Sequence, residues 1–290
     1  MKKGIALLIT IGFLLILMSL IGYMLTISQN NFDKIEKIKL RNQSTIIFSD
    51  VKKILDSYAK EVKDSEDLDL FLAGLPPFYN DKSRFSLYVQ IKPLSNKINI
   101  NSILIKNKTD KNIESFIKNI CETYNILDPS FLVALILDTI DTDVVSRQAL
   151  SEISQEDIKF SNSKIINMKH FEKIVDYYIK ITQDSNIKNV PWSRLIYFGK
   201  IEKSILDCDR LSKELINVLR LQVDEFAGCE SLEDKYSKKI AKNYELKSYS
   251  KKDSYFVKVE VQYSVEDEEN SVIFDYDMKT NKATNIKNKL

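Results

Sequence analysis

The residues best suited to chemistry are three carboxylates in one short stretch, Asp138, Asp141 and Asp143. They follow the apolar run at positions 130–137, whose pattern predicts a helix that ends near them. The negative end of a helix dipole disfavours carboxylates, so a cation, Arg147 or solvent must compensate their charge. The spacing lacks the glycine and the glutamate of an EF-hand loop. We therefore expect a solvated or salt-bridged surface cluster, with calcium as the weaker alternative and no residue assigned as its ligand.

Other groups that could catalyse a reaction stand alone in the sequence. His170 is the single histidine, which excludes a histidine-rich metal site. It lies in a helical pattern beside charged residues, where we expect a surface or capping role, and no serine or cysteine has the setting of a nucleophile elbow. Glu152 and Glu156 stand one helical turn apart, a spacing that is common on solvated helices. The sequence therefore predicts no catalytic residue and no enzymatic activity.

The charge balance argues against nucleic acid as a partner. The chain carries 43 Lys and Arg against 41 Asp and Glu, and a net charge of +2 gives no strong attraction for a polyanion. Segment 235–252 is basic with interleaved tyrosines, as in some single-strand binders. Because acidic stretches flank it, we do not expect it to bind nucleic acid.

The three cysteines form at most one pair. In an exported domain the favoured disulfide joins Cys208 and Cys229, because they flank one helix-length segment. Cys121 is then left over, and its helical, apolar surroundings predict a buried thiol. Connectivity does not follow from sequence alone, so the other pairings stay open.

The N-terminal region predicts a membrane anchor. Residues 5–26 contain no charge over 22 positions, which is long enough to cross a bilayer. Lys2 and Lys3 precede this span and favour a cytoplasmic N-terminus, with about 260 residues on the other side. A cleaved secretory signal peptide is the alternative, but no small-residue cleavage site lies between Thr26 and Asp33.

The leader MKKG ends at Gly4, and the apolar run begins at once with Ile5. This layout resembles the class III leader of type IV pilins and type II secretion pseudopilins. The resemblance implies that a prepilin peptidase cuts between Gly4 and Ile5, that the new terminal amine is methylated, and that the apolar helix is retained. Most such proteins carry glutamate where this chain has Ile9, and there it is thought to neutralise the amine of a neighbouring subunit. In lacking this glutamate, the chain resembles the minor pseudopilin K family of the type II (general) secretion pathway.

Beyond the span, residues 27–62 predict an amphipathic continuation of the same helix, with a linker or coiled-coil segment as the alternative. Its apolar positions recur at intervals of three and four: Phe32, Ile35, Ile38, Ile47, Val51, Ile54, Leu55, Tyr58 and Val62. Strict alternation predicts strands at 84–92 and 253–265. A further strand region follows the acidic turn EDEEN, with a second turn at Thr280 and Asn281.

Three internal segments are also similar to the pseudopilin K family. Asn99 and Asn101 flank Ile100 as in its GKINLN-type segment, although a polar turn before a helix would look the same. The family's LLDWIDPD-like sequence matches at Leu137, Asp138, Ile140, Asp141 and Asp143, with Thr139 and Thr142 replacing Trp and Pro. A downstream stretch is similar through Asn162, Ile166, Phe171 and Val175.

The resemblance implies an α+β fold in which a long N-terminal helix packs on a small antiparallel sheet that carries a large all-helical insertion. The expected boundaries are a leader at 1–4, a transmembrane part at 5–26, an amphipathic part at 27–62, a first β part at 63–98, the insertion at 99–200 and the remaining α/β part at 201–290.

The function implied by the resemblance is that of a minor pseudopilin that caps the periplasmic pseudopilus tip and helps initiate its assembly for protein export. The implied partners are minor pseudopilins of the I and J types, prepilin peptidase, the inner-membrane assembly platform, and the secretin or cargo. The anchor would lie in the inner membrane and the globular part in the periplasm. Alternatives are a pseudopilin for DNA uptake, an uncleaved signal-anchored periplasmic binding or sensor module, and a membrane-anchored hydrolase.

Overall fold

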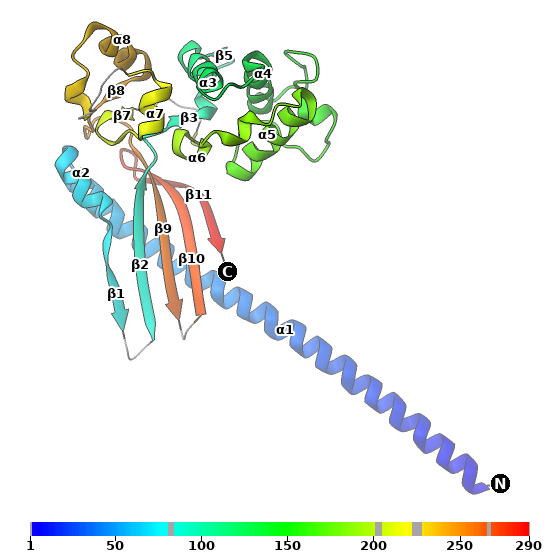
Figure 1. Cartoon of the computed structure of the whole chain (residues 1–290). Helices are drawn as coiled ribbons and strands as arrows, with labels where there is room; N and C mark the ends of the chain where they lie inside the picture. The colour runs from blue at the N-terminus through cyan, green and yellow to red at the C-terminus, as the bar shows by residue number, and fades with distance from the viewer. Residues whose placement is uncertain (1, 81–83, 201–204, 222–227, 266–267, 290) are drawn as a thin grey trace.

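A single long helix, α1 (Lys2–Glu61), opens the chain. The computed structural model describes residues 2–80, 84–200, 205–221, 228–265 and 268–289, with side chains described from Met18 onward except at 30, 33, 37 and 289. The C-terminal part of α1 lies along a β-sheet, and its N-terminal part projects well beyond the sheet (Figure 1). This confirms the long N-terminal helix. After it, Asp64 caps α2 (Ser65–Leu72) by accepting hydrogen bonds from the backbone N–H groups of residues 66 and 67.

Among the residues whose side chains are described, none belongs to a helix that is both long and apolar enough to cross a membrane. Residues 1–17 lie outside that set. They include most of the predicted span, the predicted cleavage site at Gly4 and Ile5, and Ile9.

The sheet has five antiparallel strands in the order β1-β2-β9-β10-β11. Their bounds are β1 (Leu75–Asn80), β2 (Phe85–Pro93), β9 (Phe256–Val265), β10 (Glu268–Asp277) and β11 (Lys282–Lys289). β2 and β9, far apart in sequence, are central neighbours, with Val89 opposite Val261. The early strand and the late hairpins predicted from alternation are therefore confirmed.

The first strand, β1, precedes the earliest strand predicted from alternation, and it contains Pro76 and Pro77, residues that usually interrupt strands. Proline is tolerated on an edge strand, where its missing N–H has no partner to lose, and β1 is such an edge. Gly74 makes the turn into it with φ +82°, and a Cβ there would lie 2.6 Å from the carbonyl oxygen of Val89.

One face of the sheet packs on α1. Alternate residues of the central strands, including Val259, Val261 and Phe274, form a buried cluster with Val51 and Leu55 of the helix. Successive strand side chains point to opposite faces, so the residues between them lie on the other, largely polar face. The sheet thus has one face covered by α1 and one face free of it.

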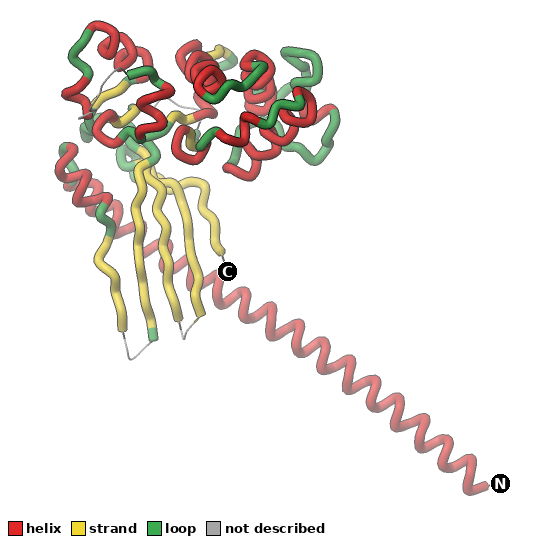
Figure 2. The backbone as a smooth tube through the Cα atoms, in the orientation of Figure 1, coloured by secondary structure: helices red, strands yellow, loops and turns green. Residues whose placement is uncertain are grey.

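Between β2 and β9 the chain forms a large insertion that sits over one end of the sheet and is mainly helical (Figure 2). Its helices are α3 (Lys111–Thr123), α4 (Pro129–Ile140), α5 (Met168–Thr182), α6 (Trp192–Leu195), α7 (Lys213–Val218) and α8 (Lys235–Tyr244). Three short strand pairs join its parts: β3 (Ile98–Asn99) with β6 (Ile196–Tyr197), β4 (Leu104–Ile105) with β5 (Lys108–Thr109), and β7 (Leu206–Asp207) with β8 (Leu246–Lys247).

One hydrophobic core unites this insertion. It contains Phe116 and Ile117 of α3 together with Leu215 of α7 and Ile240 of α8, and it extends from Ile98 to Leu246 along the chain. The expected boundary at residue 200 therefore falls inside the insertion, and residues 205–246 belong to it rather than to the sheet part. The strand pairs also correct the expectation of an all-helical insertion.

Candidate functional site

Helix α1 carries an exposed apolar surface. Phe32, Ile35, Ile38 and Ile46 are 59–69% exposed, and we call these four residues the outer stripe. At 3.6 residues per turn, the three isoleucines lie about 140–160° around the helix from the buried Val51, and Phe32 lies about 100° from it. Closer to the N-terminus the exposed apolar residues are Met18, Leu20, Ile21, Tyr23, Met24, Leu25 and Ile27. Exposed apolar surface of this extent marks a site of contact with another apolar surface.

Two of the three carboxylates of the acidic cluster are buried and salt-bridged, which agrees with the expected salt bridge and corrects the expected surface position. Asp138 is fully buried and Asp141 is 8% exposed, and the guanidinium of Arg147 pairs with both carboxylates. The backbone N–H of Arg147 donates to Asp138 Oδ2 over 3.0 Å. Asp143 is exposed and accepts from the backbone N–H of residue 145. Ile140, in the same motif, is part of the insertion core. Arg147 is therefore the compensating charge.

Burial raises the pKa of Asp141, although its hydrogen bond and ion pair with Arg147 act in the opposite direction. The carboxylate is thus held in its charged form by one guanidinium against a desolvation cost.

A calcium ion at this cluster would compete with Arg147 for the two buried carboxylates. Arg147 already lies between the two buried carboxylates, and Asp143 hydrogen-bonds elsewhere. Three oxygens nearby, Asp141 Oδ1, Glu152 Oε2 and Asn162 Oδ1, are buried without a hydrogen-bond donor. Among the described residues, three acidic, histidine or cysteine side chains place their ligand atoms within 4.8 Å of one another only at Cys208, Asp209 and Cys229. Because the two sulfurs of that group form a disulfide, we assign no metal ligand.

Asn99 and Asn101 hold together three distant parts of the insertion. Asn101 is fully buried; its Nδ2 donates to the carbonyl oxygens of Ile165 and Gly199, each over 2.9 Å, and its Oδ1 accepts from the Ile165 N–H. Asn99 Oδ1 accepts from the Gly199 N–H over 3.0 Å, and its Nδ2 donates to the carbonyl of Lys200. These two motif residues therefore link the start of the insertion to Ile165 and to Gly199 and Lys200.

Asn162 anchors the loop between α4 and α5. Its Nδ2 donates to Glu152 Oε1 over 2.7 Å and more weakly to the carbonyl of Asp143. Glu152, expected on a solvated helix, is 2% exposed and also accepts from the Ser154 hydroxyl. The loop is thus ordered around a buried carboxylate that the sequence placed on a solvated helix.

A second buried ion pair joins the insertion to α2. Asp207 is fully buried and accepts from the Tyr255 hydroxyl over 2.7 Å and from Arg210 over 2.9 Å. Arg210 also donates to Asp69 Oδ1 over 2.6 Å and to the carbonyl of Ser65 over 2.9 Å. Burial raises the pKa of Asp207, and its partners oppose that shift. An aspartate within the apolar run ILDC was the available sequence signal for this network.

His170 is buried, which corrects its expected surface position. Its Nδ1 accepts from the Ile166 N–H over 3.3 Å, and its ring packs against Phe160 with centroids 4.8 Å apart. Burial lowers its pKa and favours the neutral ring. The geometry gives it a capping contact at the start of α5.

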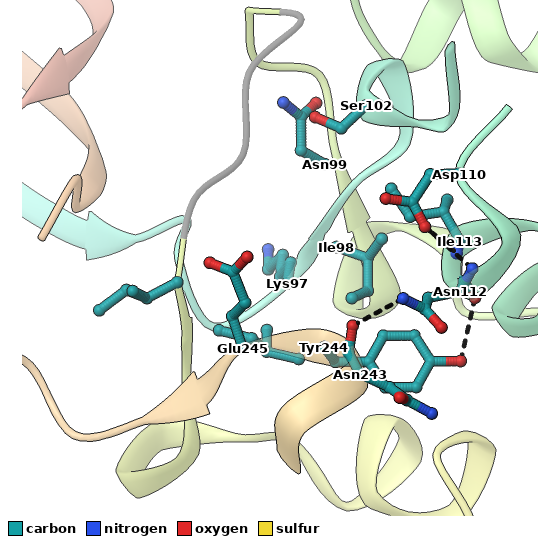
Figure 3. Close-up of a pocket in the computed structure, with 12 residues that line it drawn as sticks. Lys97, Ile98, Asn99, Ser102, Asp110, Asn112, Ile113, Asn243, Tyr244 and Glu245 are labelled. Carbon is teal, nitrogen blue, oxygen red and sulfur yellow. Dashed lines mark hydrogen bonds between the residues drawn. The ribbon is translucent and has the colours of Figure 1, made fainter. Parts of the chain in front are cut away.

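The cavity in Figure 3 lies at the seam between α3 and α8. Asn112 donates to the carbonyl of Asn243 over 2.9 Å, and the Tyr244 hydroxyl donates to the carbonyl of Asn112 over 3.0 Å. The cavity has a volume of about 60 Å³, which is small compared with the roughly 300–1,000 Å³ of typical ligand pockets. We read it as a packing seam between two parts of the insertion.

A disulfide joins Cys208 and Cys229, the pair that the sequence favours, with Cα atoms 5.1 Å apart. Cys121 is a free, buried thiol on α3, and burial raises its pKa to about 12, which keeps it protonated and unreactive.

Replacing both Cys208 and Cys229 with serine should lower the free energy of unfolding by about 3 kcal/mol, because the bond spans 21 residues of the unfolded chain. Urea denaturation measures the difference. Dithiothreitol should bring the wild type to the stability of the double variant and leave the variant unchanged. Equal stability of the oxidised wild type and the variant would contradict a stabilising role.

No protein-family model matches this chain, and no curated protein matches it in sequence. Its fold does match solved structures. One is a chain of the GspK–GspI–GspJ complex from the type 2 secretion system of enterotoxigenic Escherichia coli, with a TM-score of 0.60 and 11% sequence identity. The match covers 89% of this chain and 99% of that chain. The long helix, the antiparallel sheet and the insertion between its central strands thus give this chain a GspK-like pseudopilin fold, as the family resemblance implied.

Proposed function

We propose that this chain is a minor pseudopilin of a type II secretion-type system that caps the periplasmic pseudopilus tip and helps initiate its assembly for protein export. The observation that carries this proposal is the GspK-like fold over 89% of the chain, insertion included. The four-residue leader and the apolar run from Ile5 add an independent sequence feature of the same protein class.

The position of the insertion supports a place at the tip. It sits at the end of the sheet opposite the projecting part of α1 (Figure 1). A subunit stacked above this one along a filament would meet the insertion. At the other end, Ile9 provides no carboxylate for the terminal amine of a further subunit.

The partners in this proposal are minor pseudopilins of the I and J types, because the matched structure holds GspK with GspI and GspJ. The outer stripe is the surface we assign to them, since exposed apolar side chains on a helix pack well against another apolar helix. Prepilin peptidase, the assembly platform, and the secretin or cargo complete the proposed contacts.

The proposed location is the inner membrane for residues 5–26 and the periplasm for the globular part. Disulfides persist in oxidising compartments, so the Cys208–Cys229 bond supports an exported domain. The role is structural rather than enzymatic.

The test is the intact mass and N-terminal sequence of membrane-extracted protein from strains with and without prepilin peptidase. We expect a methylated chain that begins at Ile5 only when the peptidase is present. The matched variant is Gly4→Leu, which should remain uncut in both strains because the residue before the cut is lost.

A chain that begins at Met1 in both strains would overturn the proposal and leave an uncleaved, signal-anchored periplasmic module. If processing occurs, protein export and DNA uptake measured in a strain that lacks this chain separate a secretion pseudopilin from a competence pseudopilin. Loss of DNA uptake with normal export would contradict the secretion role.

A further inference from the structure

A basic recess lies where the free face of the sheet meets the insertion. It has a volume of about 370 Å³, and we call it the junction groove. Lys92 of β2, Lys258 of β9 and Lys287 of β11 reach it from the sheet, and Lys97 reaches it from the segment after β2. The rest of the lining mixes apolar and polar side chains, among them Ile166, Met168, Phe198, Ile273, Asn167 and Ser193.

Two of the four lysines of the junction groove bring like charges together. Lys92 and Lys258 stand directly opposite each other on neighbouring strands, an arrangement in which like charges destabilise a sheet. Within the described part of the chain, Lys92, Lys258 and Lys287 form no salt bridge. Asp275 is the one carboxylate in the lining, against four ammonium groups. It lies on β10 opposite Lys258 and attracts Lys258 and Lys287, and it accepts from Asn285 Nδ2 over 2.6 Å.

Lys97 is repelled by two of the other lysines. It is partly buried, and its ammonium donates to the carbonyl of Ser193 over 2.7 Å. Burial lowers its pKa, and repulsion from Lys258 and Lys92 lowers it further. Asp275 offsets part of the positive charge of Lys258 and Lys287, but one carboxylate does not balance four ammonium groups, and an anionic ligand would neutralise the remainder.

We propose that the junction groove binds an acidic segment of a partner protein, with side-chain carboxylates on Lys92, Lys258 and Lys287. Two features favour a peptide over a polyphosphate backbone. Apolar side chains lie between the lysines and suit the apolar residues of a peptide. The lysines also converge on one recess, whereas grooves that bind a phosphate backbone place them along a track.

The probe is a fluorescein-labelled peptide of six glutamates, titrated against the detergent-solubilised full chain and followed by fluorescence anisotropy. We expect the triple variant Lys92→Gln, Lys258→Gln and Lys287→Gln to bind at least tenfold more weakly than the wild type. The control carries the same charge change at exposed residues of α8, Lys235→Gln, Lys238→Gln and Lys239→Gln, and should change affinity less than twofold.

A second readout separates loss of the site from loss of the fold. The groove variant loses the repulsion between Lys92 and Lys258 and also the attraction of Lys258 and Lys287 to Asp275. Because these changes oppose each other, its melting temperature without peptide should stay close to that of the wild type. Equal weakening in the control variant would overturn the proposal by showing unspecific attraction. Tighter binding of a short single-stranded DNA than of the peptide would also overturn it, in favour of nucleic acid.

Discussion

Replacing Arg147 with alanine should lower the free energy of unfolding by about 3–5 kcal/mol, because it leaves two buried carboxylates without a counter-charge. Asp138 is fully buried and Asp141 nearly so, and the arginine side chain pairs with both. Ser151 would still donate to Asp138, but within the described residues no other cationic side chain forms a salt bridge with either carboxylate. Urea denaturation of the purified chain measures the loss.

The loss should depend on pH with a defined sign. Burial already raises the pKa of Asp141, and Arg147 is the group that opposes this rise. Without it, the folded-state pKa moves further above the unfolded value of about 3.9. The folded state then binds protons more readily than the unfolded state, so acidification favours folding. The deficit of the variant should be full near pH 7 and should shrink as pH falls through the folded-state pKa.

Arg220→Ala is the matched control. Arg220 pairs with Glu122, but both side chains are about half exposed, and such surface pairs contribute about 0–1 kcal/mol. Two results would contradict the role of Arg147 as the counter-charge of the buried carboxylates. One is an equally small loss in the free energy of unfolding for both variants. The other is a larger loss for the Arg147 variant on mild acidification.

Introducing two charges into the outer stripe, Phe32→Glu with Ile35→Glu, should weaken association with the proposed minor pseudopilin partners at least a hundredfold. Both side chains are more than 60% exposed in the isolated chain, so the change should leave its stability nearly unaltered. In a helix–helix interface the two carboxylates would be desolvated without partners, at a cost of several kcal/mol. Co-purification from detergent extracts measures the complex.

A control with the same change in net charge is Lys34→Ala with Arg41→Ala, two exposed positions on α1 outside the stripe. It should retain the complex. Unchanged co-purification of the stripe variant, with both variants equally helical by circular dichroism, would show that partners bind elsewhere.

Local sequence pattern was sufficient for the long helix and the central strands of this fold. The three- and four-residue spacing of apolar side chains along α1 and the strict alternation in β2 and β9 depend on single periodicities, and each appears where the pattern placed it. The Cys208–Cys229 bond could also be predicted, because the two cysteines flank one short segment and only one other cysteine is present. The leader, the apolar run and three short motifs were enough to indicate the fold family.

Contacts between distant segments set the rest, and no local pattern contains them. Whether Asp138 and Asp141 face water or Arg147 depends on how the loop after α4 folds back, nine residues beyond Asp138. Strand β1 exists because an edge position accepts its prolines, and the insertion continues past residue 200 because α7 and α8 pack on α3. The junction groove joins lysines of three strands with the segment before β3, a meeting that only the assembled sheet and insertion produce.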